Sequence, residues 1–168
     1  MSDDWTGVVR LEGGLPAITF RRRYGTDVDD LWSAVTEPER LGRWLATVTG
    51  DLRPGGDVVV TFDDGSDPDQ RTTGRILACE PPSVLEVEWG IPGEAESVVR
   101  VELADVDGGA ELRLDHRRLP ARQAAGYGAG WHCHLDTLDA YLRGVEPPDW
   151  GARWSALLPD YTERLASA

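Results

Sequence analysis

The sequence contains no lysine, only two cysteines and no long apolar run. It contains 17 basic residues, all of them arginine, and 30 acidic residues, which gives a formal net charge of -13. This charge repels phosphate backbones and anionic lipids, so neither nucleic acid nor a membrane surface is expected as a partner. Apolar stretches such as residues 58–60 are far shorter than the roughly 20 residues of a membrane span. The acidic start at residues 1–4 is unlike a signal peptide, so a cytoplasmic location is expected.

Metal, cofactor and standard catalytic motifs are also missing. Cys79 and Cys133 are far apart and lack the close-spaced partners of a zinc site or disulfide framework. His132 and His134 flank Cys133, but helix positions two apart point roughly 200 degrees from each other and cannot share one ion. We find no Gly-x-Ser-x-Gly elbow, no Gly-Lys phosphate loop and no dinucleotide fingerprint. The sequence therefore indicates no metal and no cofactor.

What is present is the composition of one globular domain, with 168 residues of which 40% are hydrophobic. Ile18 and Phe20 alternate with polar residues and predict a strand over about 16–24. Two short helices follow it, the second beginning at Pro38. Between 47 and 119 we expect six strands, separated by turn signals at residues 54–56, 63–65, 81–82, 92–93 and 108–109.

After Pro120 the apolar period changes to that of a helix. One stripe predicts a long amphipathic helix that ends at Gly144, and its members are Ala124, Gly128, Trp131, Leu135, Leu138 and Leu142. We therefore divide the chain into an N-terminal arm over 1–14, a domain over 15–144 and a tail over 145–168. The tail is expected to form one or two short helices that pack on the domain.

This order of elements predicts an α+β fold in which a curved antiparallel sheet of about seven strands wraps around the long helix. Three segments carry a family resemblance: residues 53–56 (Arg-Pro-Gly-Gly), residues 74–89 and residues 130–142. They resemble the SRPBCC superfamily, most closely the bacterial single-domain homologues of the activator of heat-shock protein 90 ATPase. The resemblance implies a START-like helix-grip fold with a cavity between the sheet and the long helix. It implies no single activity, because relatives include lipid binders, polyketide cyclases and co-chaperone domains.

Aromatic residues are the main candidates for a ligand site. In the gripped arrangement several side chains are expected to converge on the cavity, namely Trp32, Trp44, Trp89, Tyr127, Trp131 and Leu135. Ordinary core packing explains the same residues. Gly128 lies on the inward stripe, where the missing side chain leaves space for a ligand, for a lid motion, or for an aromatic ring packed against the helix backbone.

Two polar residues stand at strand positions whose side chains are expected to point to the buried face of the sheet. Arg22 follows Ile18 and Phe20, and His116 follows Leu112 and Leu114, so both are expected to point to the dry face of the sheet. A buried arginine needs a partner. Arg22 and His116 therefore either orient a ligand carboxylate, carbonyl or phenol, or lie at frayed strand ends in water; Arg22 also has the option of pairing with an acid.

Three functions follow as hypotheses. The first is non-catalytic binding of a small apolar or aromatic molecule in the cavity. The second is a co-chaperone-like or stress-related module that binds a protein partner, with a homodimer as a further option. The third is a cyclase or hydrolase acting on aromatic polyketide-like substrates, with one His or Arg as the acid-base group.

Overall fold

A computed structural model describes residues 5–62, 71–91 and 93–168. The acidic start at 1–4, the predicted turn at 63–65 and Pro92 of the turn at 92–93 lie outside these residues. The strands are β1 (Val8–Glu12), β2 (Leu15–Tyr24), β3 (Thr47–Gly50), β4 (Asp57–Thr61), β5 (Arg71–Glu80), β6 (Val84–Trp89), β7 (Ser97–Val106) and β8 (Gly109–Arg117). The helices are α1 (Val28–Thr36), α2 (Pro38–Trp44), α3 (Ala121–Arg143) and α4 (Trp150–Ala166).

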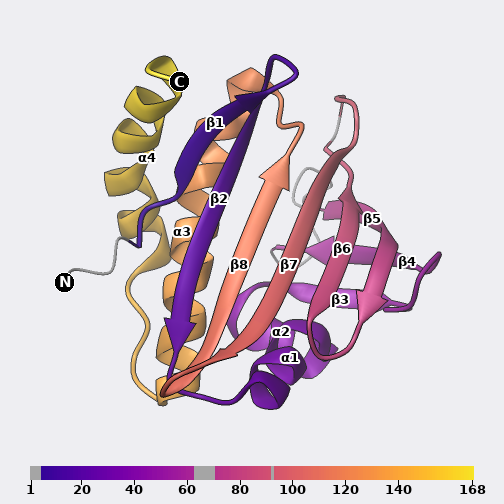
Figure 1. Cartoon of the computed structure of the whole chain (residues 1–168). Helices are drawn as coiled ribbons and strands as arrows, with labels where there is room; N and C mark the ends of the chain where they lie inside the picture. The colour runs from indigo at the N-terminus through magenta and orange to yellow at the C-terminus, as the bar shows by residue number, and fades with distance from the viewer. Residues whose placement is uncertain (1–4, 63–70, 92) are drawn as a thin grey trace.

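All strands form one antiparallel sheet in the order β1-β2-β8-β7-β6-β5-β4-β3. The sheet curves, α3 lies across one of its faces, and α1 and α2 lie at one end (Figure 1). This is the expected α+β helix-grip fold, and six strands lie between 47 and 119 as predicted. The sheet has eight strands rather than seven because residues 8–12, which we assigned to the N-terminal arm, pair with β2 from Val8 opposite Thr19 to Glu12 opposite Leu15.

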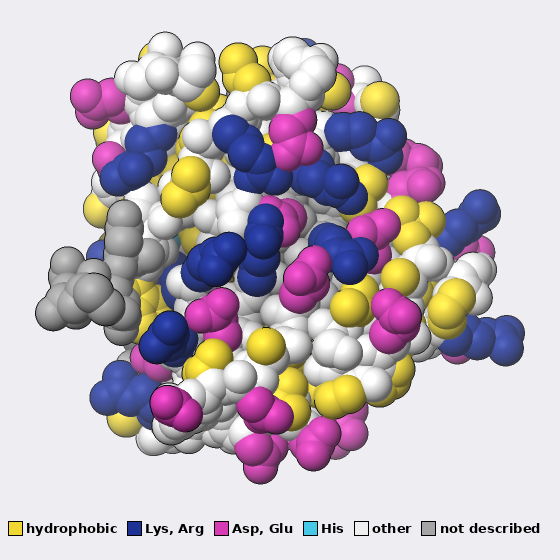
Figure 2. Space-filling model, viewed as in Figure 1, with side chains coloured by type: hydrophobic (Ala, Val, Ile, Leu, Met, Phe, Trp, Pro, Cys, Tyr) yellow, Lys and Arg dark blue, Asp and Glu magenta, His cyan; other side chains and the backbone are white. Residues whose placement is uncertain are grey.

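The outer face of the sheet is lined by charges of both signs (Figure 2). Arg100 pairs across the strands with Glu86 at 2.9 Å, and along its own strand with Glu102 at 2.7 Å. Partly exposed pairs of this kind contribute only about 0–1 kcal/mol each, so they support the register while the opposite face forms the core.

The long helix α3 places its apolar stripe on that opposite face. Its side chains at Ala124, Trp131, Leu135 and Leu138 are buried, as the period predicted. The helix ends at Gly144, which takes the left-handed conformation with φ 68° and so terminates the helix at little conformational cost.

The tail forms one helix, α4, which lies alongside α3 (Figure 1). Its only fully enclosed side chain is Tyr161, whose ring packs on Gly128 of α3. The Tyr161 hydroxyl accepts a hydrogen bond from the Gly7 N–H at 2.8 Å. The gap at Gly128 therefore admits an aromatic ring, the third of our alternatives, and the ring comes from the tail.

We predict that Gly128→Ala destabilises the protein by about 1–3 kcal/mol. A Cβ atom at this position would lie 2.7 Å from Tyr161 Cδ1 and 3.0 Å from Ile18 Cδ1, so α4 would have to move away from α3. Gly126→Ala and Gly130→Ala are matched controls on the same helix, since an added Cβ meets nothing closer than 3.7 Å there. Both controls should stabilise by up to about 1 kcal/mol through helix propensity. Urea unfolding measures all three, and equal effects would contradict the close contact at Gly128.

Candidate functional site

One hollow of the structure is a pocket of about 530 Å³, which we call the outer pocket. It lies between α2, α3, the ends of β4 to β6 and the segment that leads into α4. Its lining residues are Trp44, Leu45, Phe62, Thr72, Trp89, Gln123, Tyr127, Gly130, Trp131, His134, Thr137, Pro147, Pro148 and Trp150. The volume falls within the range of about 300–1,000 Å³ typical of small-molecule sites.

A second, smaller hollow lies deeper, between α3 and the dry face of the sheet. This inner cavity holds about 80 Å³ and is lined almost entirely by apolar side chains, including Val58, Val60, Leu112 and Leu135. It shares Trp44, Leu45, Trp89 and Trp131 with the outer pocket. The expected space between sheet and helix is therefore mostly filled by side chains, and the larger volume opens beyond the Trp89 and Trp131 rings.

Four rings form a closed circuit of contacts at the base of the outer pocket. The centroid of Trp89 lies 5.7 Å from that of Trp131 and 6.1 Å from that of Phe62. His134 completes the circuit, 6.0 Å from Trp131 and 5.7 Å from Phe62. Trp150, the first residue of α4, lies 5.3 Å from His134. Aromatic side chains from α3, from β6, from the residue after β4 and from the start of α4 therefore line one pocket.

Three of the ring side chains in this wall carry a polar group, and Thr72, Gln123 and Thr137 also line the pocket. Among the described residues, Trp89 Nε1 and His134 Nδ1 are buried without a hydrogen bond of normal geometry. Burial raises the pKa of Tyr127, and the neighbouring Trp89 N–H opposes that rise. Burial lowers the pKa of His134 to about 4, against a smaller opposing effect of the Trp44 backbone. At neutral pH the described residues of this wall thus offer hydrogen-bonding groups and carry no charge.

His116 lies behind this wall, fully buried, in a chain of hydrogen bonds. Trp131 Nε1 donates to His116 Nδ1 at 2.9 Å, which assigns the ring proton to Nε2. Nε2 then donates to Ser97 Oγ at 2.7 Å, and Ser97 donates to the Trp89 carbonyl at 3.0 Å. Burial lowers the pKa of His116 to about 3. The residue positions Trp131 and Trp89, and it does not line either hollow.

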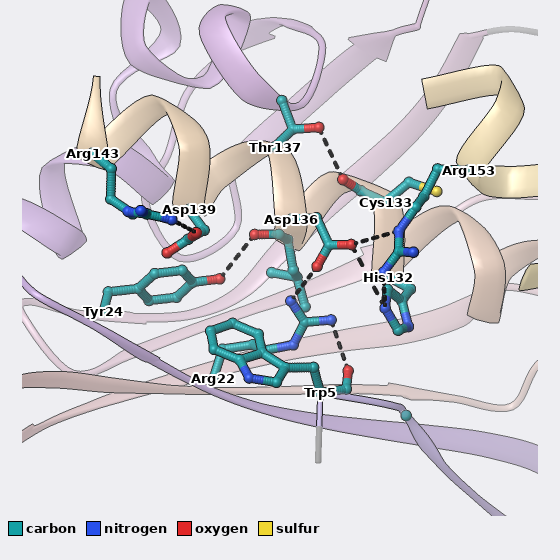
Figure 3. Close-up of polar contacts among 12 residues, drawn as sticks. Trp5, Arg22, Tyr24, His132, Cys133, Asp136, Thr137, Asp139, Arg143 and Arg153 are labelled. Carbon is teal, nitrogen blue, oxygen red and sulfur yellow. Dashed lines mark hydrogen bonds and ion pairs between the residues drawn. The ribbon is translucent and has the colours of Figure 1, made fainter. Parts of the chain in front are cut away.

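Arg22 lies in a different cluster, on the side of α3 that faces α4 (Figure 3). Its NH1 group donates to Asp136 Oδ1 at 2.8 Å and its NH2 group donates to the Trp5 carbonyl at 2.7 Å. The second Asp136 oxygen accepts from Arg153 of α4 at 3.2 Å and lies 3.6 Å from His132 Nε2. We call Arg22, His132, Asp136, Arg153 and Tyr161 the latch, because together they join α4 to α3 and β2.

The predicted site residues therefore divide into three groups. Trp44, Trp89, Tyr127 and Trp131 line the outer pocket, and Leu135 lines only the inner cavity. Trp32 lines neither hollow and packs against the core from α1. Arg22 and His116 are buried and partnered, so neither lies at a frayed end in water, and Arg22 pairs with an acid, which was one of its alternatives. Neither residue is among those that line the two hollows.

Sequence reasoning did not select Phe62, His134 or Trp150 as site residues, although all three line the outer pocket. Phe62 continues the parity of Val58 and Val60, and His134 stands three residues after Trp131 on the helix, so both carried a signal. Trp150 carried none, because only the path of the tail brings it to the pocket. Among the described residues there is no cluster of His, Cys, Asp and Glu arranged to hold a metal ion, and no helix long and apolar enough to cross a membrane.

Comparison with known proteins now adds the family. The model for "Activator of Hsp90 ATPase homolog 1-like protein" matches residues 26–143, from just before α1 to the last residue of α3. The chain belongs to this family. The match includes every residue of the four-ring circuit and stops before α4, so the family segment itself carries the base of the pocket. No protein of curated function matches the chain.

Solved structures agree with this assignment. CalU16 from Micromonospora echinospora is 30% identical, with a TM-score of 0.78 over 95% of this chain and 96% of that one. DynU16, described as a protein of the dynemicin biosynthetic locus, is 25% identical, with a TM-score of 0.68 over 78% of this chain and 48% of its own. Aha1 from Colwellia psychrerythraea, solved as a dimer, is 15% identical with a TM-score of 0.66 over 75% of this chain and 95% of that one. That last likeness supports the fold alone.

Proposed function

We propose that this protein binds a small aromatic molecule in the outer pocket, without catalysis of its own. The observation that carries the proposal is the pocket of about 530 Å³ whose base is the circuit of Phe62, Trp89, Trp131 and His134. Flat rings on several sides of a hollow favour flat apolar ligands, because stacked and edge-to-face contacts add about 0.5–1.5 kcal/mol each to the burial of area. The origin of DynU16 in a biosynthetic locus is consistent with a small-molecule ligand.

The same groups favour binding over catalysis. A general acid or base must carry a pKa near the working pH and reach the reacting atom. His134 is the titratable imidazole in the pocket wall, and its pKa of about 4 leaves it neutral and a weak base at pH 7. His116 and Arg22, our earlier candidates for a cyclase-type site, are engaged with protein partners.

The direct test is native mass spectrometry of freshly purified protein, followed by tryptophan fluorescence titration with a naphthalene probe. We predict that Trp150→Ala weakens binding of the probe by about five- to tenfold, since an aromatic contact is lost. Trp154→Ala is the matched control: Trp154 stacks on Trp150 from the next turn of α4, with centroids 6.4 Å apart, but does not line the pocket. Equal losses in the two variants, or no binding by the unaltered protein, would contradict the proposal.

A further inference from the structure

Resting on the proposed function, we infer that the aromatic ligand carries a short alkyl substituent of about three carbons, which enters the inner cavity while the rings occupy the outer pocket. Three features of the inner cavity support this inference: its size, its apolar lining and its position next to the outer pocket. An empty apolar hollow leaves the side chains around it without contacts on one side, and an alkyl group supplies those contacts.

The inner cavity is too small for an aromatic ring. Its volume is about 80 Å³, whereas an apolar cavity of about 150 Å³ in a protein core accepts benzene. A water molecule occupies about 30 Å³ in the liquid, and a methylene group is of similar size. The cavity therefore has room for about three carbons, and the rings of the ligand stay in the outer pocket of about 530 Å³.

The lining of the inner cavity is chemically uniform, because every described residue in it is Val, Leu or Trp. The Trp44 N–H donates to a backbone carbonyl of α1 and the Trp131 N–H donates to His116, each at 2.9 Å. The Trp89 N–H lies beside the Tyr127 hydroxyl. A hydroxyl or a charged group in this cavity would therefore lose its water without gaining a partner. Apolar hollows of this kind stay dry, so an alkyl group enters without displacing bound solvent.

The inner cavity adjoins the outer pocket. The two hollows share Trp44, Leu45, Trp89 and Trp131, so a chain attached to a ring in the outer pocket meets the inner cavity at these side chains. Trp44 and Trp131 are held by the hydrogen bonds given above, whereas Leu45 is half-buried and has no polar side-chain atom to anchor it. We therefore expect the chain to enter beside Leu45, because this side chain can move between staggered rotamers.

The experiment is a chain-length series on one ring system: 2-methyl-, 2-ethyl-, 2-propyl-, 2-butyl- and 2-hexylnaphthalene, titrated at pH 7 by tryptophan fluorescence and calorimetry. From methyl to propyl we expect the affinity to rise by about three- to fourfold per carbon, the effect of burying one methylene. From butyl onward it should rise no further, because the cavity is full. The probe 2-(2-hydroxyethyl)naphthalene has the shape of the propyl probe and should bind at least about tenfold more weakly, because its hydroxyl group finds no partner.

Two variants of β4 change the inner cavity in opposite directions. Val58 and Val60 line the inner cavity and not the outer pocket. The double variant Val58→Ile/Val60→Ile adds two carbons to the cavity wall, so the preference for propyl- over methylnaphthalene should fall from about tenfold to about threefold or less. Val60→Ala enlarges the cavity, and butylnaphthalene should then bind about three- to fourfold more tightly than propylnaphthalene.

Val59→Ile is the matched control, because Val59 lies between these two residues on β4 and lines neither hollow; it should leave the series unchanged. The inference is wrong and the proposed function stands if affinity ignores chain length or rises steadily to hexyl, if the hydroxyethyl probe binds as well as the propyl probe, or if the double variant gives the same series as Val59→Ile. If no naphthalene binds, the proposed function is wrong and the inference with it. The series on the unaltered protein and on Val60→Ala decides between these outcomes even where the double variant fails to fold.

Discussion

Asp136→Asn should lower the free energy of unfolding by about 3–5 kcal/mol, because it leaves a buried arginine without its counter-ion. The Arg22 side chain is 0% exposed and lies 2.8 Å from the Asp136 carboxylate. Its Nε atom has no partner among the described residues, so the guanidinium depends on Asp136 and on the Trp5 carbonyl. Chemical unfolding at pH 7 measures the effect.

Asp139→Asn is the matched control, one turn later on α3. Asp139 pairs with Arg143, whose side chain is 65% exposed, and exposed pairs contribute only about 0–1 kcal/mol. Adding Arg22→Met to Asp136→Asn should recover part of the loss, since the unpaired charge is then removed. Similar losses for Asp136→Asn and Asp139→Asn would show that the latch ion pair is dispensable.

The second large effect is a loss of folding stability at low pH, which we expect from the buried His116. Burial lowers the pKa of His116 from an ordinary 6.5 to about 3, so the unfolded chain binds a proton at this residue at a higher pH than the folded protein does. The stability due to neutral His116 is therefore fully present above pH 6.5 and is lost as the pH falls from 6.5 toward 3. A difference of this size corresponds to roughly 5 kcal/mol over the whole window. His132 and His134, with pKa values lowered to about 4, act in the same direction.

His116→Gln isolates this contribution, because glutamine binds no proton. Between pH 6 and pH 4 the variant's unfolding free energy should fall less steeply than that of the unaltered protein, by about 1.4 kcal/mol per pH unit, the value for one proton. At pH 7 the variant should be less stable, because the hydrogen bonds with Trp131 and Ser97 are altered. Urea unfolding from pH 7.5 to 4 gives both numbers. Parallel curves would mean that His116 titrates normally in the folded protein.

Local patterns predicted most of the fold. Strand geometry explains why Ile18 and Phe20 point to the same face, and helix geometry explains the apolar stripe from Ala124 to Leu138. Both patterns depend only on residues that are close together in the chain. The strand over residues 8–12 was not predicted, because Val8, Val9 and Leu11 do not alternate regularly with polar residues. This strand forms through hydrogen bonds to β2. As an edge strand with exposed Val8 and Leu11, β1 leaves only a weak periodic signal.

By itself the sequence determined which rings face inward, because the periods of 2 and 3.6 place Trp89 and Trp131 on the buried side of their elements. Only the tertiary structure decided what these rings surround. The tail brings Trp150 to His134, Tyr161 fills the gap at Gly128, and Asp136 of α3 meets Arg22 of β2. These contacts join residues far apart in the chain, and their geometry depends on how whole elements pack. The pocket and the latch are therefore properties of the assembled layers, whereas the elements that form them can be predicted from local sequence.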